Sequence, residues 1–319
     1  MAATTNFVAA QAANRRNTLL LLVVLTALAA LFGYLIGWVL EGYVTDTVAA
    51  VSYTGLGAAA ILSATSIIWS GISLAFGSRM VLAMADAKPI EKAEAPQLFN
   101  VVEEMSIAAG VPMPKVMVME TDALNAFATG TSTSNAAIVV TRGLLQTLTR
   151  EELQGVIGHE MGHIANLDTR YMTIVGVTVG LIALVASMVL RTLQWGSYSN
   201  RSSSSDRKSS GGSAILIIVL LVVAVLAPIA AKAVQMAVSR QREYLADATS
   251  VQFTRNPEGL ISALQKLEAA AKPFPGVSDA TQHLFIVNPV QRVTEKTSAL
   301  MATHPDIDSR IARLRNLGA

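Results

Sequence analysis

Four long runs without a charged residue dominate the pattern of hydrophobic and polar positions along the chain. They cover Thr18–Leu40, Thr47–Ser78, Tyr171–Leu190 and Gly211–Ala231. Each run approaches or exceeds the roughly 20 apolar residues that an α-helix needs to cross a lipid bilayer. The pattern therefore predicts four hydrophobic helices in two hairpins, the first at 18–80 and the second at 171–231.

A cleaved signal sequence is the alternative interpretation of the first run. Arg15 and Arg16 precede it, and Ala27-Leu28-Ala29 resembles a cleavage site. The apolar stretch continues to Leu40, however, and is longer than the apolar region of a typical signal peptide. We therefore favour a helix that is retained in the membrane.

Basic residues lie before the first run and after the second, whereas the link between these runs has none. They are Arg15, Arg16, Arg79, Lys88 and Lys92. The positive-inside rule then makes residues 1–17 a cytoplasmic tail and places the region after the first hairpin in the cytoplasm. The Ser/Gly-rich link of the second hairpin carries basic residues and fits this orientation poorly, so full crossing by that hairpin stays open. We expect a multi-pass protein of the inner (plasma) membrane.

Composition supports the membrane assignment and excludes several function classes. Charged residues make up 14% of the 319 residues, against about 25% in soluble domains. The net charge of +2 is too small for the basic surface that nucleic-acid binding requires. The absence of cysteine excludes disulfides, zinc–cysteine sites and thiol nucleophiles.

Two segments of globular composition remain, at 81–170 and 232–319. Their periodicity predicts a helix at 96–109, strands at 115–119 and 136–141, a helix through 260–267 and a last helix through 307–314. The expected fold is a mostly α-helical membrane protein that carries an α+β domain with a small β-sheet.

A capping box fixes the start of one further helix. Thr149 is followed three positions later by Glu152, so we expect a helix to begin at Arg150. This helix carries the sequence His159-Glu160-Met161-Gly162-His163.

The two histidines of this sequence lie one turn apart on the same helical face. Two neutral imidazoles in that position can bind one divalent cation from one side, and Glu160 can then polarise a water molecule. The chain has four histidines in all, which makes a chance pair flanking a glutamate improbable. A helix with two surface histidines is the alternative interpretation.

A catalytic zinc ion takes three protein ligands and one open position. The remaining candidates for the third ligand are Asp168, Glu243, Asp247, His283 and His304. Glu243 and Asp247 share one helical face, where Glu243 could bind the metal while Asp247 accepts a hydrogen bond from a ligating histidine. A solvated charged face is the alternative for this pair.

Four motifs in the same order resemble HtpX, a membrane zinc endopeptidase of bacteria and archaea whose wider group includes the C-a-a-X prenyl protease. They are His159 to Asn166, Asn125 to Gly130, Arg242 to Asp247 and Thr303-His304-Pro305. The resemblance covers about 81–319. It implies a zincin-like protease domain in two parts, at 81–170 and 232–319, with one zinc ion per chain held by His159, His163 and Glu243. It also implies Glu160 as general base.

The same resemblance implies cleavage of misfolded or damaged membrane proteins at a cytoplasmic site, as part of protein quality control. It makes Asn125, Ala126 and Phe127 part of a strand beside the active site, where substrate could pair in extended form; an ordinary loop is the alternative. His304 is a candidate hydrogen-bond donor to the oxyanion, although a lone histidine is often structural.

Two functions other than quality-control proteolysis stay open. One is a non-catalytic membrane adaptor that uses zinc to clamp two helices, with His304 or Asp247 as a fourth ligand. The other is a prenyl-peptide protease, which would need a large membrane chamber that four spans are too few to enclose. The sequence does not decide whether Arg310 forms a salt bridge or contacts substrate, and it leaves the oligomeric state open.

Overall fold

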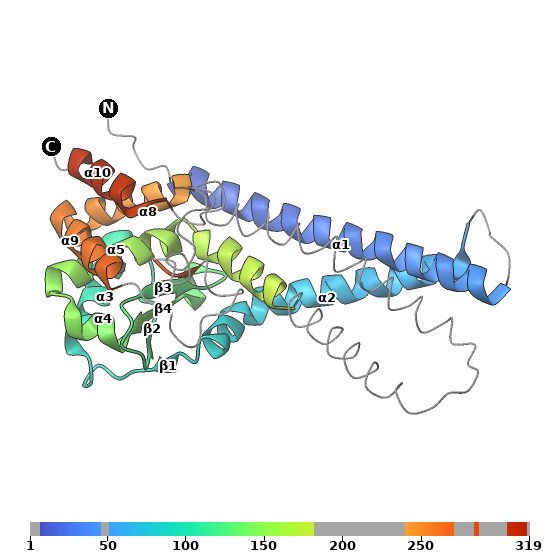
Figure 1. Ribbon diagram of the computed structural model, residues 1–319, viewed down its shortest axis with the longest axis horizontal. Coiled ribbons are helices and arrows are strands. Elements are labelled where there is room, and N and C mark those ends of the chain that lie inside the picture. Colours follow the sequence, from blue (N-terminus) through green and yellow to red (C-terminus); the bar gives the residue numbers. More distant parts are fainter. Residues whose placement is uncertain (1–6, 46–50, 182–239, 271–283, 287–304, 318–319) are drawn as a thin grey trace, which may run out of the picture. The chain divides into compact units, whose positions relative to one another are not determined.

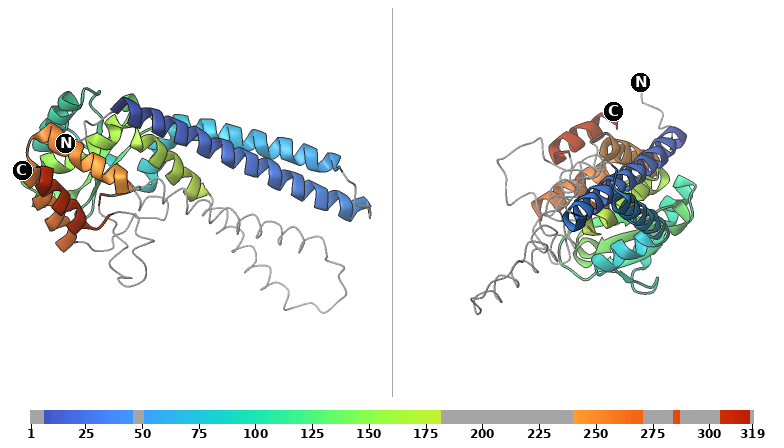
Figure 2. Two further views of the ribbon diagram at one scale, coloured as in Figure 1. Left: turned by 90° about the horizontal axis from the view of Figure 1, so that it is seen from above. Right: turned by 90° about the vertical axis from the view of Figure 1, so that its right-hand side faces the viewer.

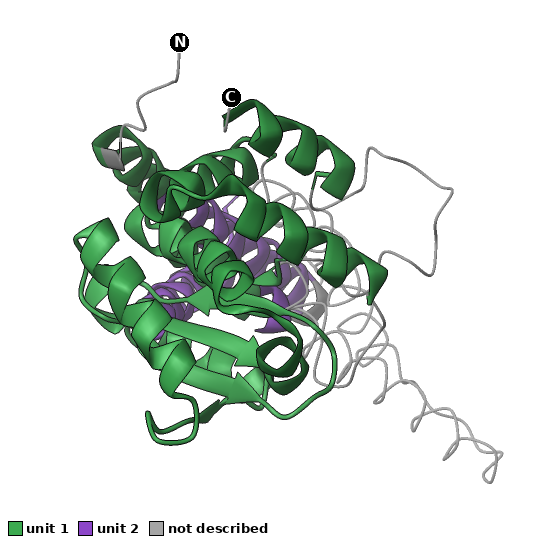
Figure 3. Cartoon of the chain, turned by 90° about the vertical axis from the view of Figure 1, so that its left-hand side faces the viewer, with its two compact units in different colours: residues 1–18, 74–177, 234–319 green, residues 19–73, 178–233 purple. Residues whose placement is uncertain are grey.

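The computed structural model describes residues 7–45, 51–181, 240–270, 284–286 and 305–317 (Figure 1). The chain divides into two compact units (Figure 3). Unit 1 contains 1–18, 74–177 and 234–319, and unit 2 contains 19–73 and 178–233. The predicted fold class is confirmed in part, since the described residues include two long apolar helices and a small mixed sheet. The structure describes the predicted second hairpin only as far as position 181, and the rest of it lies outside the described residues.

Two helices, α1 (Phe7–Thr45) and α2 (Tyr53–Met84), correspond to the predicted first hairpin. Both are long and apolar enough to cross a membrane. Within unit 2 they pack closely because small residues face each other: a Cβ atom added at Gly33 would lie 2.6 Å from the carbonyl oxygen of Ala58. The two helices run side by side (Figure 2). In lipid, the hydrophobic effect does not drive helices together, and small residues instead let their backbones pack closely.

Unit 1 contains the α+β elements that the structure describes. They are β1 (Lys88–Pro89), α3 (Pro96–Ala109), β2 (Lys115–Met119), β3 (Ala126–Thr129), β4 (Ala137–Thr141), α4 (Arg142–Thr147), α5 (Arg150–Ala165), α8 (Arg240–Thr254), α9 (Pro257–Ala269) and α10 (Ile307–Leu317). A further helix runs through 168–181. The predicted strands at 115–119 and 136–141 and the predicted helix at 96–109 are confirmed.

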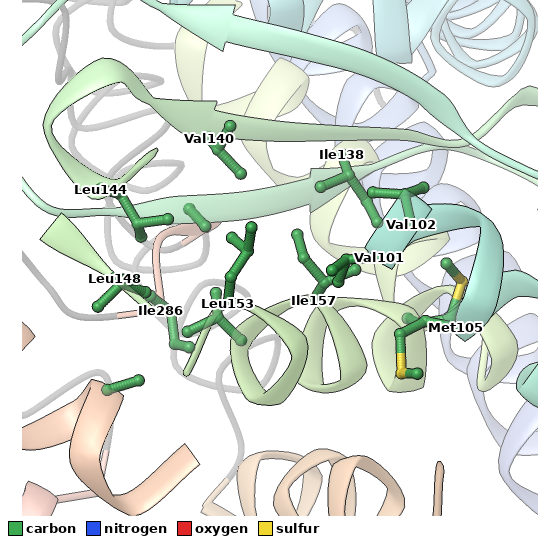
Figure 4. Packing of buried hydrophobic residues seen from close by; sticks show 14 of the residues in the cluster. Val101, Val102, Met105, Ile138, Val140, Leu144, Leu148, Leu153, Ile157 and Ile286 are labelled. Carbon is green, nitrogen blue, oxygen red and sulfur yellow. The ribbon is translucent and has the colours of Figure 1, made fainter. Parts of the chain in front are cut away.

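The sheet has the strand order β1-β2-β4-β3, so β3 lies at its edge. β2 and β4 are parallel, whereas β3 pairs with β4 in the antiparallel direction. Ile138 and Val140 of β4 face Leu153 and Ile157 of α5 across the core (Figure 4). Helix α5 also contacts the edge strand β3.

Glycines on α5 allow α8 and α9 to pack against its other side. A Cβ atom added at Gly155 would lie 2.6 Å from the backbone nitrogen of Leu260, and one at Gly158 would lie 2.9 Å from the hydroxyl oxygen of Ser250. The Ser250 hydroxyl donates to the carbonyl oxygen of Gly155 at 2.7 Å. Helix α5 is therefore enclosed, and the side chains that follow Gly158 are buried.

The predicted capping box at the start of α5 is confirmed. The Glu152 carboxylate accepts the backbone N–H of Thr149 at 2.8 Å, and it also accepts from Ser262 at 2.6 Å and from Lys266 at 2.7 Å. Burial raises the pKa of Glu152, but these donors outweigh it and hold the pKa below its usual 4.5. One carboxylate thus ties the first turn of α5 to α9.

We expect Glu152→Ala to lower the free energy of unfolding by about 2–4 kcal/mol, because it removes a cap and leaves part of a buried ion pair without its partner. Thermal or urea unfolding of the detergent-solubilised protein measures this change. Glu151→Ala is the matched control, since Glu151 is exposed in the same turn, and it should shift stability by less than about 0.5 kcal/mol.

The stabilisation by Glu152 also has a defined pH dependence. Because the folded-state pKa is below 4.5, the contribution is fully present above that value and is lost as the pH falls through the folded-state pKa. The stability difference between wild type and Glu152→Gln should therefore shrink under acid conditions. A difference that stays constant from neutral to acid pH would contradict this assignment.

Candidate metal centre

Three potential metal ligands converge at the centre of unit 1. His159 and His163 come from α5 and Glu243 comes from α8, and all three are buried. Each histidine turns its Nε2 atom to the Glu243 carboxylate, at 3.7 Å for His159 and 3.6 Å for His163. One ligand atom from each residue lies within 4.8 Å of the other two. Tetrahedral zinc separates its nitrogen and oxygen ligands by about 3.3–3.5 Å, so the two distances to the Glu243 carboxylate are close to those that zinc requires.

Each imidazole ring also forms a hydrogen bond to a carboxylate through its other nitrogen, Nδ1. The Nδ1 atom of His159 lies 2.9 Å from Oδ1 of Asp247, and Nδ1 of His163 lies 3.0 Å from Oδ2 of Asp168. An ionised carboxylate can only accept, so each Nδ1 carries a proton, and in the neutral ring that a metal ion requires Nε2 then has the lone pair. That tautomer is the one in which a histidine can bind a metal ion through Nε2.

Arg310 of α10 forms a buried, bidentate salt bridge with Asp247. Its Nε donates to Oδ2 at 2.9 Å and its Nη2 donates to Oδ1 at 2.7 Å. The 3.3 Å approach of Nη2 to Nδ1 of His159 is a contact only, because that nitrogen already donates to Asp247. Of the two roles left open by the sequence, the described residues therefore give Arg310 that of a salt-bridge partner.

The same neighbours shift the pKa values of the buried groups. Burial raises the pKa of the Asp247 carboxyl, but Arg310 and His159 outweigh burial and lower it. Burial lowers the pKa of His163, whereas the hydrogen bond to Asp168 and the charge of Glu243 raise it, with a net value of about 9. The carboxylates thus favour positive charge at this centre, which a divalent cation would supply.

Glu160 follows His159 on α5 and is also buried. Burial raises the pKa of its carboxyl to about 7, opposed by the charge of His163 and by a hydrogen bond from the backbone N–H of Ala128 in β3. A carboxyl group with a pKa near neutrality can both accept and release a proton under ordinary conditions. Its position beneath β3 brings this group next to the edge of the sheet.

The predicted substrate residues Asn125, Ala126 and Phe127 lie at the start of this edge strand. The strand interpretation of Ala126 and Phe127 is confirmed, and Asn125 directly precedes β3. The Ala126 carbonyl oxygen accepts the N–H of Ile286 at 3.0 Å, and the Phe127 ring meets Phe285 edge-on at 5.0 Å. Residues 284–286 therefore contact part of the edge at which an extended peptide could pair.

The other predicted residues divide into those placed beside the metal centre and those outside the described chain. Asp168, a candidate ligand, instead contacts the far nitrogen of His163. Leu167 before it adopts a left-handed backbone conformation, with φ of 59°. This turn separates α5 from the helix through 168–181 and brings Asp168 back to His163. His283 and His304 lie outside the described residues.

Sequence reasoning did not identify one polar residue of the first helix. The Nδ2 group of Asn14 donates to Oδ1 of Asp168 at 2.7 Å and to the carbonyl oxygen of Asn166 at 2.9 Å. Gln11 donates to the carbonyl oxygen of Ala165 at 2.7 Å. The signal was a polar stripe, since Gln11, Asn14 and Thr18 share one helical face just ahead of the apolar run.

Known proteins resemble this chain over most of its length. The model of peptidase family M48 matches residues 92–318. Protease HtpX homologs of Streptococcus pyogenes, from serotype M28 (strain MGAS6180) and serotype M5 (strain Manfredo), are 42% identical over 305 residues, which is 95% of this chain and 97% of theirs. The crystal structure of Ste24p from S. mikatae superposes with a TM-score of 0.40 and 20% identity, covering 76% of this chain and 57% of that one. The resemblance predicted from the motifs is confirmed, and the chain belongs to peptidase family M48 as an HtpX-like membrane metalloprotease.

Proposed function

We propose that the protein is a zinc-dependent endopeptidase that hydrolyses misfolded or damaged membrane proteins on the cytoplasmic side of the inner membrane. One observation carries the enzymatic part of the proposal. His159, His163 and Glu243 converge on one point, with both imidazole tautomers fixed by carboxylates and with Glu160 next to them.

The same geometry favours an open metal site over a structural clamp. A closed structural site needs a fourth protein ligand, and Asp247 was the candidate on α8. In the described residues, Asp247 contacts Nδ1 of His159 and not the Nε2 side on which Glu243 lies. A fourth position for water thus remains available among the described residues.

When bound at this centre, zinc supplies Lewis acidity, which acidifies water and polarises a peptide carbonyl. Glu160 accepts the proton of the attacking water on its carboxylate and delivers it to the leaving amine nitrogen as the C–N bond breaks. Arg310 and Asp247 keep the His159 ring in place during this transfer. His304 remains a predicted donor to the oxyanion.

The edge strand β3 supports a broad substrate range. Main-chain pairing at a strand edge recognises extended peptide without demanding particular side chains. The Ala128 N–H contacts Glu160, so a peptide that pairs with β3 passes close to the proposed base. Such recognition suits an enzyme that removes many unrelated damaged proteins.

Loss of the third ligand tests the metal set. Glu243→Ala should release zinc from the purified protein, because two imidazoles alone bind the ion far more weakly. Metal analysis after dialysis measures this directly. Glu258→Ala, which removes an exposed carboxylate of the same unit, should keep about one zinc ion per chain. Full zinc content in Glu243→Ala would overturn the proposed ligand set.

Loss of the proposed base tests the chemistry separately. Glu160→Gln should retain zinc yet lower the rate of casein cleavage by at least about 10²–10⁴-fold, because it cannot accept the proton of water. Glu151→Gln on the same helix should cleave normally, and a zinc chelator should abolish that activity. Equal cleavage by wild type and Glu160→Gln would rule out the proposed enzymatic function.

The proposed orientation can be tested with single cysteines, since the natural chain has none. We expect a membrane-impermeant maleimide to label Val51→Cys in intact cells, because it lies in the link of the first hairpin. Lys92→Cys should react only after the inner membrane is permeabilised. Both positions are exposed, so reversed labelling would place the metal centre on the opposite side.

A further inference from the structure

Buried hydrogen bonds link the first hydrophobic helix to a proposed zinc ligand within unit 1. They run from Nδ2 of Asn14 to Oδ1 of Asp168 at 2.7 Å, and from Oδ2 of Asp168 to Nδ1 of His163 at 3.0 Å. The exposed fractions are 4% for Asn14, 1% for Asp168 and 4% for His163. Water therefore has little access to any of the three groups, and each depends on the next for its partner.

We infer that Asn14 is a positioning residue for the metal centre and acts through Asp168 on His163. The inference rests on the proposed zinc site, and it assigns a part of that site to the membrane helix α1. Nothing in the four motifs of the protease domain includes this position.

The amide of Asn14 has a defined orientation. Both of its partners, the Asp168 carboxylate and the Asn166 carbonyl oxygen, can only accept hydrogen bonds. The side chain must therefore point its NH₂ group at them, and both N–H bonds are used. This arrangement fixes one carboxylate oxygen of Asp168, so that the other stays in line with the His163 ring.

Other described donors do not replace Asn14 at this oxygen. Arg242 approaches Oδ1 of Asp168 only to 3.6 Å, beyond hydrogen-bond distance. Its guanidinium lies over the ring of Tyr171, 4.9 Å from the centroid. Without the amide, Asp168 would keep its charge interaction with Arg242 but would lose the short bond that sets its rotation. Partners of this kind behind a metal ligand affect metal affinity by about 10–100-fold.

Gln11 provides a matched comparison on the same helix. It also docks α1 on the end of α5, through the carbonyl oxygen of Ala165 at 2.7 Å, but it does not contact Asp168. A role limited to docking the helix would make Gln11 and Asn14 equivalent. A positioning role would make only Asn14 important for the metal.

The test measures zinc affinity by chelator competition on the full chain in detergent. Asn14→Ala should weaken zinc binding by about 10–100-fold, while Gln11→Ala should change it by less than about threefold. Asn14→Asp, which keeps the size but presents oxygen to two acceptors, should bind zinc at least as weakly as Asn14→Ala. If Asn14→Ala does not yield monodisperse protein, the zinc affinity of Asn14→Asp decides the test. Cobalt-substituted protein should show altered ligand-field bands for both Asn14 variants and unchanged bands for Gln11→Ala.

A double-mutant cycle shows whether the effect passes through the carboxylate. In an Asp168→Ala background, Asn14→Ala should cause no further loss of zinc affinity, because the link is already broken. Equal zinc affinities for Asn14→Ala and Gln11→Ala, or an additive effect in the cycle, would overturn the inference. A wild-type protein that binds no zinc would instead overturn the proposed function.

Discussion

The metal centre depends on two hydrogen bonds that set the protonation state of its histidines. Asp247 and Asp168 each accept a hydrogen bond from an Nδ1 atom, so that both Nε2 atoms face the Glu243 carboxylate. The bond to Asp247 requires α8 to lie directly against α5, and the glycines of α5 make that approach sterically allowed. The local packing of the two helices and the chemistry of the site therefore follow from the same few positions.

The charge of the centre also follows from its burial. Glu160, Glu243, Asp168 and Asp247 are buried together, and Arg310 is buried among them. Buried carboxylates of this number are costly unless positive charge balances them. The fit of a divalent ion to this surplus is an electrostatic argument that is independent of the motif.

Local patterns predicted the elements and the ligand-bearing motif. The capping box at Thr149 gave the start of α5, apolar periodicity gave α3, and two β-type runs gave β2 and β4. Glu243 was predictable as a candidate ligand because it shares a helical face with Asp247. The roles of Asp168 and Asn14 were not, since they depend on the turn at Leu167 and on contacts between segments about 150 positions apart, as with Asn14 and Asp168. Spacing within one helix carries no information on such distant contacts.

The docking of α1 on the end of α5 has a practical consequence for work on the isolated catalytic portion. A soluble fragment prepared by trimming the N-terminal anchor would lose Gln11 and Asn14, and the carbonyl oxygens of Ala165 and Asn166 would lose their side-chain donors. Oδ1 of Asp168 would lose its donor as well. For this chain the anchor and the enzyme are better purified as one piece.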